Sequence, residues 1–183
     1  MDKFYTGVGS RDTPDPVAEK MEKIAVLLYN AEYILRSGGA LGADTAFERG
    51  VNFATKGIDS GKWKRIYVPW KGFRASFGQD DIHEIHKDAF RIASRIHLVW
   101  NRLSDAEKRL HARNVHQVLG DNLMTPSKFL VCWTLDGLSQ GGTRTAIMLA
   151  KEVKIPVYNL GSSKYKYLTP DQVVDMIFQE EKG

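Results

Sequence analysis

Three short turns in this sequence contain glycine and hydroxyl residues in an arrangement suited to binding phosphate. They span residues 7–11 (GVGSR), 37–44 (SGGALGAD) and 141–145 (GGTRT), and each follows or ends an apolar run typical of a strand. The second and third turns also open segments with helical periodicity. Unpaired N–H groups and the dipole at a helix N-terminus favour an anion, and glycine lets the anion approach the backbone closely. Together the turns indicate a nucleotide-like ligand.

Side chains near these turns could complete the ligand site. Arg11 can bind phosphate in a bidentate manner, with an ordinary surface arginine as the alternative. Trp70 and Trp133 end predicted strands, where an aromatic face could stack on a base or pack in the core. Arg113 and Asn114 could reach a phosphate and a base edge, or serve helix packing. The predicted ligand-binding residues are Gly7, Gly9, Ser10, Arg11, Ser37, Gly38, Gly39, Gly42, Ala43, Asp44, Trp70, Arg74, Trp133, Gly141, Gly142, Thr143 and Thr145.

A glycine-flanked loop at residues 71–78 contains an arginine between two aromatic residues. Phe73, Arg74 and Phe77 could close over a bound ligand, because loops of this kind act as lids at binding sites. A mobile loop without that role is the alternative.

Two carboxylates are candidate catalytic groups. Glu48 lies one helical turn after Asp44, and Asp136 follows the predicted strand that ends near Trp133. Cleavage of an N-glycosidic bond requires a carboxylate that activates water or stabilises an oxocarbenium-like ribose. A structural role for each is the alternative. Asp44 could bond a ribose hydroxyl, but we prefer the interpretation that it caps its own helix.

The remaining reactive residue types do not indicate metal or thiol chemistry. His83 and His86 lie three residues apart and His111 and His116 five apart, with no cysteine or carboxylate cluster to complete a metal site. We therefore expect no metal and no cofactor. Cys132 lies within an apolar strand and should be inert.

Strand-like and helix-like segments alternate along the chain, which predicts an α/β fold. The pattern is that of a Rossmann-like, doubly wound, mostly parallel sheet flanked by helices. The turns then lie at carboxyl ends of strands, where such sheets bind ligands. No repeat or linker divides the chain, so we expect a single domain over residues 1–183. Predicted strands cover 3–8, 33–37, 65–70, 129–134 and 156–160, and predicted helices cover 17–28, 43–54, 81–94, 104–119, 143–153 and a terminal segment from 169.

Composition limits the class of protein. With 183 residues, 43% of them hydrophobic, the chain can form a sizeable core. No apolar run reaches the roughly 20 residues of a membrane helix, and a single cysteine excludes an internal disulfide. Because residues 1–4 lead directly into a strand-like segment, we expect no secretory signal. We therefore expect a cytoplasmic protein. The net charge of +4 is compatible with an anionic ligand or with nucleic acid and selects neither.

The three turns resemble those of the SLOG superfamily, a Rossmann-like group that includes DNA-processing protein A (DprA) and the LOG-type nucleotide phosphoribohydrolases. Residues 37–46 (SGGALGADTA) resemble the first turn of that group, residues 141–146 (GGTRTA) the second, and residues 7–11 the opening strand and turn. The similarity in pattern covers about Phe4 to Leu160. It implies the ligand position given above, and it implies a homo-oligomer, since oligomers are common in the superfamily.

The chain also departs from the LOG pattern in a way that bears on activity. LOG enzymes carry a glutamate in the helix after the second turn, where this chain has Ala146, Ile147 and Met148. The resemblance therefore implies binding of a nucleotide or a nucleotide-derived, ADP-ribose-like or cyclic signal rather than its turnover.

Short stand-alone proteins of this kind occur in bacteriophages, so the resemblance further implies a viral counter-defence protein that sequesters such a signal in the host cytoplasm. One alternative is a nucleotide N-glycosidase that uses Glu48 or Asp136. Another is a DprA-like protein that binds single-stranded DNA, with Lys62, Lys64 and Arg65 as contacts.

Overall fold

The computed structural model describes residues 2–74 and 81–183, in which five parallel strands form one sheet. The strand order is β3-β2-β1-β4-β5, so the chain winds outward from β1 in one direction and then resumes on its other side at β4. This confirms the predicted Rossmann-like α/β fold. The strands are β1 (Lys3–Gly9), β2 (Tyr33–Ser37), β3 (Lys64–Ile66), β4 (Leu130–Trp133) and β5 (Val157–Asn159).

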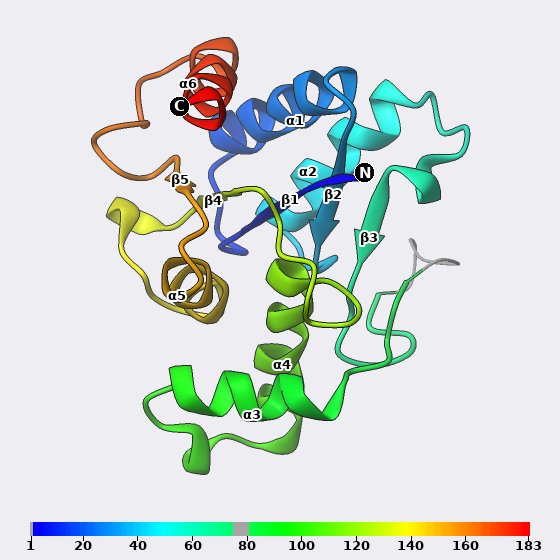
Figure 1. The fold of residues 1–183 in the computed structure, drawn as a ribbon, viewed down its shortest axis with the longest axis vertical. Helices are drawn as coiled ribbons and strands as arrows, with labels where there is room; N and C mark the ends of the chain where they lie inside the picture. Colours follow the sequence, from blue (N-terminus) through cyan, green and yellow to red (C-terminus); the bar gives the residue numbers. More distant parts are fainter. Residues whose placement is uncertain (1, 75–80) are drawn as a thin grey trace.

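Helices cover both faces of the sheet (Figure 1). One face packs against α1, α2 and α6, and the other against α3, α4 and α5. The strands supply both cores by alternation: in β4, Val131 and Trp133 join the first core, and Leu130 and Cys132 join the second. The helices are α1 (Asp15–Asn30), α2 (Ala43–Ala54), α3 (Lys87–Ile96), α4 (Asp105–Leu119), α5 (Arg144–Glu152) and α6 (Pro170–Lys182), with 3-10 turns η1 (Ser60–Lys62), η2 (Trp100–Arg102) and η3 (Leu135–Gly137).

Local sequence signals explain where two of these helices begin. Ser104 caps α4 by accepting a hydrogen bond from the backbone N–H of Glu107 at 3.3 Å, and the Glu107 carboxylate accepts from the Ser104 N–H at 2.8 Å. This is the predicted capping box. Thr169 and Gln172 form the same arrangement at α6, with Pro170 in its first turn.

The predicted helix over residues 81–94 was wrong in its first half. Ile82 instead pairs with the extended chain after β3: its N–H donates to the Ile66 carbonyl, and its carbonyl accepts from the Val68 N–H, both at 2.8 Å. Helix α3 begins only at Lys87, where His86 accepts a hydrogen bond from the Asp88 N–H. Pairing with the sheet edge satisfies the backbone of this segment and overrides its helical pattern.

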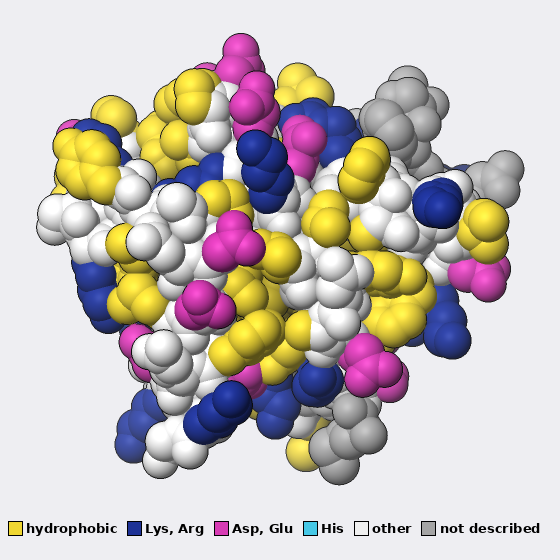
Figure 2. Space-filling model, turned by 90° about the horizontal axis from the view of Figure 1, so that it is seen from above, with side chains coloured by type: hydrophobic (Ala, Val, Ile, Leu, Met, Phe, Trp, Pro, Cys, Tyr) yellow, Lys and Arg dark blue, Asp and Glu magenta, His cyan; other side chains and the backbone are white. Residues whose placement is uncertain are grey.

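The surface over α1, α2 and α6 carries both signs of charge. Figure 2 shows Lys and Arg side chains interspersed with Asp and Glu and separated by apolar groups on this face, without a continuous basic stripe. None of the helices in the described part of the chain is long and apolar enough to cross a membrane. Phe77, which we expected in a lid with Phe73 and Arg74, lies outside the described residues.

Candidate functional site

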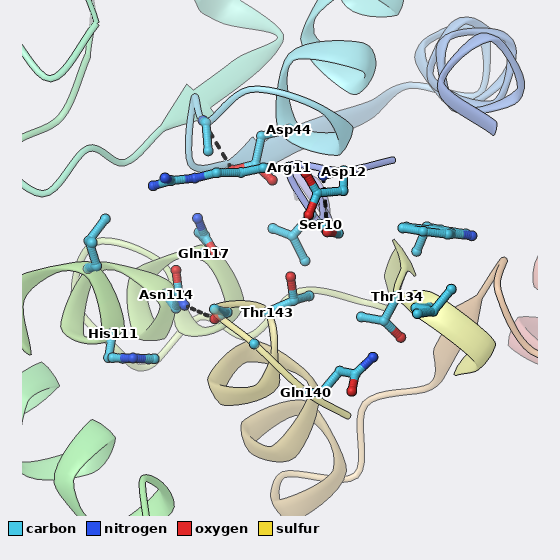
Figure 3. Close-up of a pocket in the computed structure, with 18 of the residues that line it drawn as sticks. Ser10, Arg11, Asp12, Asp44, His111, Asn114, Gln117, Thr134, Gln140 and Thr143 are labelled. Atoms are coloured by element: carbon cyan, nitrogen blue, oxygen red, sulfur yellow. Dashed lines mark hydrogen bonds between the residues drawn. The ribbon is translucent and has the colours of Figure 1, made fainter. Parts of the chain in front are cut away.

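A cavity of about 840 Å³ opens at the carboxyl ends of β1 and β4, where the strand order reverses. Open α/β sheets bind their ligands at this point. Its walls are the turn after β1, the turn before α5 and one face of α4 (Figure 3). The predicted ligand-binding residues that line it are Gly9, Ser10, Arg11, Asp44, Trp133, Gly141, Gly142 and Thr143.

The turn before α5 presents unpaired backbone donors. Within the described residues, the N–H groups of Gly141, Gly142 and Thr143 have no hydrogen-bond partner. A Cβ on either glycine would meet nothing within 4 Å, so packing does not require glycine at these positions. Helix α5 begins immediately afterwards, and no side chain caps it. The turn and the helix N-terminus together offer donors and a favourable dipole to an anion.

The turn after β2 has a different character, because the protein's own arginines pack against its glycines. Arg113 donates a hydrogen bond to the Gly38 carbonyl, and a Cβ on Gly38 would lie 2.6 Å from Arg113 Cζ. Gly39, with φ of 65°, lies against Arg74, whose guanidinium carbon would be 3.0 Å from an added Cβ. Glycine at this turn therefore permits close approach of guanidinium groups of the chain itself.

Asp44 lies between this turn and Arg113. Its carboxylate accepts a hydrogen bond from the Ala40 N–H at 3.3 Å, and Oδ2 is 3.8 Å from Arg113 Nη1. The N-cap of α2 is Gly42, without a side-chain cap, so our expectation that Asp44 caps this helix was wrong. Burial raises the pKa of Asp44, while Arg113 and the surrounding backbone N–H groups oppose that change.

One face of α4 forms the wall beside the turn before α5. It presents His111, Asn114 and Gln117, whose spacing of three places them on the same side of the helix. Asn114 Nδ2 donates to the Gly142 carbonyl at 2.8 Å, and His111 Nδ1 lies 2.8 Å from the hydroxyl of buried Thr145. The sequence analysis missed His111 and Gln117 as site residues, although polar residues at this spacing on a buried helix were a usable signal.

His111 is uncharged at neutral pH. Burial and the nearby His97 lower the pKa of His111 to about 4, and the centroids of the two rings are 4.3 Å apart. The cavity therefore gains a neutral hydrogen-bonding group here and no additional cation.

The turn after β1 forms the opposite wall with Ser10, Arg11 and Asp12 (Figure 3). Ser10 Oγ accepts a hydrogen bond from the Asp12 N–H at 3.1 Å, which fixes the turn. Arg11 is exposed and forms no ion pair with the described residues. Burial lowers the pKa of Arg113, Asp44 opposes that change, and the positive charge of Arg11 adds to it.

Glu48 lies in a buried cluster of charges outside the cavity lining. Its Oε1 is 2.8 Å from Lys64 Nζ, and Arg74 forms ion pairs with both Glu48 and Asp81. Burial alone would raise the pKa of Glu48, but the hydrogen bonds and charges of Arg74 and Lys64 lower it. The carboxylate is therefore ionised and held by two cations.

The other predicted site residues occupy structural or surface positions. Asp136 lies in η3 with φ of 54° and is exposed. The described residues contain no group of three or more His, Cys, Asp or Glu side chains that could hold a metal ion. Besides Glu48 and Asp136, the predicted residues outside the described cavity lining are Gly7, Ser37, Gly38, Gly39, Gly42, Ala43, Trp70, Arg74 and Thr145.

Comparison with known proteins supports the fold. No protein-family profile matches this chain, and no curated protein matches its sequence. Among solved structures, the Moco carrier protein of Chlamydomonas reinhardtii is similar over 100% of both chains, with a TM-score of 0.59 and 15% identity. DNA processing protein A of Helicobacter pylori, described for its single-stranded DNA binding mode, is similar over 99% of this chain and 80% of its own, with a TM-score of 0.56 and 14% identity. The chain thus has a DprA-like fold of the Rossmann-like class.

Proposed function

We propose that this protein binds a nucleotide-type ligand in the cavity between the ends of β1 and β4. The observation that carries the proposal is the turn at Gly141–Thr143, where consecutive N–H groups lack partners within the described residues. Packing requires glycine at neither position, and the backbone requires it only at Gly141, whose φ is 61°. A phosphate group would accept hydrogen bonds from this turn and from Arg11 on the opposite wall.

The rest of the cavity suits a base and a sugar. Its volume of about 840 Å³ lies within the usual range for small-molecule sites. Apolar surface from Pro14, Trp133 and Leu135 provides a place for a base, and Thr134 and His111 provide neutral hydrogen-bonding groups. Small-molecule sites combine apolar surface with polar groups that fix the ligand's orientation, and this cavity offers both.

Binding without turnover is the version that we favour, because this chain lacks the glutamate of the LOG pattern. Glu48, the first candidate for acid–base catalysis, is held by Lys64 and Arg74 outside the cavity lining. Retention of an unmodified ligand would suit sequestration of a signalling nucleotide, which the sequence resemblance implies. An N-glycosidase would instead release free base, and chromatography of nucleotides after incubation with the protein detects that product directly.

A second candidate function is binding of single-stranded DNA, which the similarity to DNA processing protein A favours. Nucleic-acid sites are rich in cations because they neutralise many phosphates. The cavity lining instead contains Arg11 and Arg113 together with three carboxylates, Asp12, Asp44 and Glu107. Binding of an oligonucleotide with strongly salt-dependent affinity, unaffected by AMP, would favour this alternative.

Calorimetric titration with AMP, ADP, ATP, ADP-ribose and cyclic AMP tests the proposal. We expect at least one of these to bind, and Arg11→Gln to weaken its affinity about tenfold, as loss of a charged hydrogen bond does. Arg91→Gln is the matched control, because Arg91 is an exposed arginine on α3 outside the described cavity lining. Absence of binding across the panel, or equal loss in both variants, contradicts the proposal.

A further inference from the structure

Asn114 connects α4 to the turn that we assign to the anion. Its Nδ2 donates to the Gly142 carbonyl at 2.8 Å, and the dashed line in Figure 3 marks this contact. We propose that Asn114 is a positioning residue that sets the direction of the backbone N–H groups in this turn for anion binding. The inference rests on the proposed function and deepens it.

Peptide geometry explains how a carbonyl contact can orient a donor. In a trans peptide the C=O and the following N–H point in opposite directions. Holding the Gly142 carbonyl on Asn114 therefore fixes the direction of the Thr143 N–H, which has no partner within the described residues. An anion gains most from donors that are already oriented, since ordering them costs free energy on binding.

The turn has few other restraints. Gly141 and Gly142 are exposed, and neither has atoms within 4 Å of the position a Cβ would take. Helix α5 has no side-chain cap, and Gly141 contributes a carbonyl that accepts from the Arg144 N–H at 3.2 Å. Two glycines in such surroundings can adopt many backbone conformations. The hydrogen bond from Asn114 is thus a specific restraint on an otherwise permissive segment.

Asn114 is itself held by a neighbour one helical turn away. With the Gln117 amide oriented so that both of its polar atoms are satisfied, its nitrogen donates to Asn114 Oδ1 at 3.3 Å. Its oxygen then accepts from the Gly38 N–H and from Arg113 Nη1, both at 3.2 Å. A chain of hydrogen bonds therefore runs from the turn after β2, through Gln117 and Asn114, to the turn before α5.

These linked hydrogen bonds lead to a prediction that direct contact between Asn114 and the ligand would not. Gln117 does not bond to Gly142, yet its removal should disturb anion binding, because it frees the Asn114 amide to rotate. Loss of either residue should weaken binding about fivefold, the effect of one neutral hydrogen bond. Gln117 lines the cavity and could also contact a ligand directly, so affinity alone is insufficient, and the backbone must be observed as well.

The experiment compares wild type with Asn114→Leu and Gln117→Met, using AMP and inorganic phosphate as probes. Affinity is measured by calorimetry, and the amide resonances of Gly142 and Thr143 are followed by NMR in the free protein and during titration. We expect both variants to shift these two resonances in the free protein and to weaken both probes about fivefold. Gln117→Met keeps the side-chain volume and provides the test should Asn114→Leu fail to fold.

The outcomes separate the two proposals. If wild type binds neither probe nor any nucleotide of the panel, the proposed function fails and this inference fails with it. If wild type binds and folded variants bind equally well, with unchanged Gly142 and Thr143 resonances, the positioning role is overturned while the proposed function stands.

Discussion

The guanidinium of Arg113 occupies the space that a Cβ on Gly38 would need. Arg113 is almost fully buried, donates to the Gly38 carbonyl and lies 3.8 Å from the carboxylate of Asp44. The glycine after β2 thus allows an internal ion pair to form close to the backbone. This differs from the turn before α5, where glycine leaves open space beside unpaired donors.

Gly38→Ala should therefore be strongly destabilising. The added methyl group would displace Arg113 and leave Asp44 without its cation, and breaking a buried pair costs about 3 kcal/mol or more. Urea denaturation measures the change in the free energy of unfolding. A variant as stable as wild type would show that the ion pair of Arg113 with Asp44 does not depend on close contact of the guanidinium with Gly38.

Gly142→Ala should have the opposite effect: it should leave stability almost unchanged and weaken ligand binding. The Cβ would meet nothing within 4 Å, so the free energy of unfolding should stay within about 1 kcal/mol of wild type. Affinity for the bound nucleotide should fall about tenfold, because the methyl group obstructs approach to the N–H groups of the turn. Denaturation and calorimetry on the same sample check both statements. Unchanged affinity in the stable variant would place the phosphate elsewhere.

Glu48→Gln should alter stability and leave ligand affinity unchanged. The substitution removes a buried carboxylate from Lys64 and Arg74, and we expect a loss of about 3 kcal/mol. Asp136→Asn is the matched control, because Asp136 is exposed and asparagine tolerates its positive φ. If wild type released free base from a nucleotide and Glu48→Gln alone abolished that release while remaining folded, Glu48 would be catalytic.

The stability of the protein should fall as pH decreases from about 6.5 to about 4. The pKa of His111 is lowered from 6.5 to about 4, so within this window the unfolded chain binds a proton that the folded protein does not. The loss of stability that His111 causes is complete once the pH falls below the pKa of His111 in the folded protein. His111→Gln should reduce the slope, and buried His116, whose pKa is also lowered by burial, should account for part of what remains. Urea unfolding from pH 7 to pH 4 measures how the free energy of unfolding depends on pH. The same dependence in wild type and in His111→Gln would argue against this assignment.

Local patterns in the sequence were sufficient for the fold. Alternating strand and helix segments predicted the parallel sheet, and the capping box at Ser104 predicted the start of α4. Residues 81–86 were predicted incorrectly, because Ile82 pairs with Tyr67, and this pairing is a tertiary contact. Periodicity within the segment could not report that contact.

The candidate site was predictable where its groups belong to turns at strand ends. Arg11 follows β1 directly, and Gly141 and Gly142 lie in the connection from β4 to α5, so topology alone brings them to the same edge of the sheet. The sequence could not distinguish these glycines from Gly38, because the difference lies in Arg113, which reaches the turn from a helix 75 positions later. The role of α4 depends in the same way on packing between distant segments.

NMR titration of the ¹⁵N-labelled protein with the nucleotides of the panel tests the central claim most directly. We expect the largest amide shifts at Gly141, Gly142 and Thr143, with smaller shifts at Ser10 and Arg11 on the opposite wall. A bound nucleotide that shifts resonances only outside this cavity, or a protein that responds to oligonucleotides and to no nucleotide, would contradict the account.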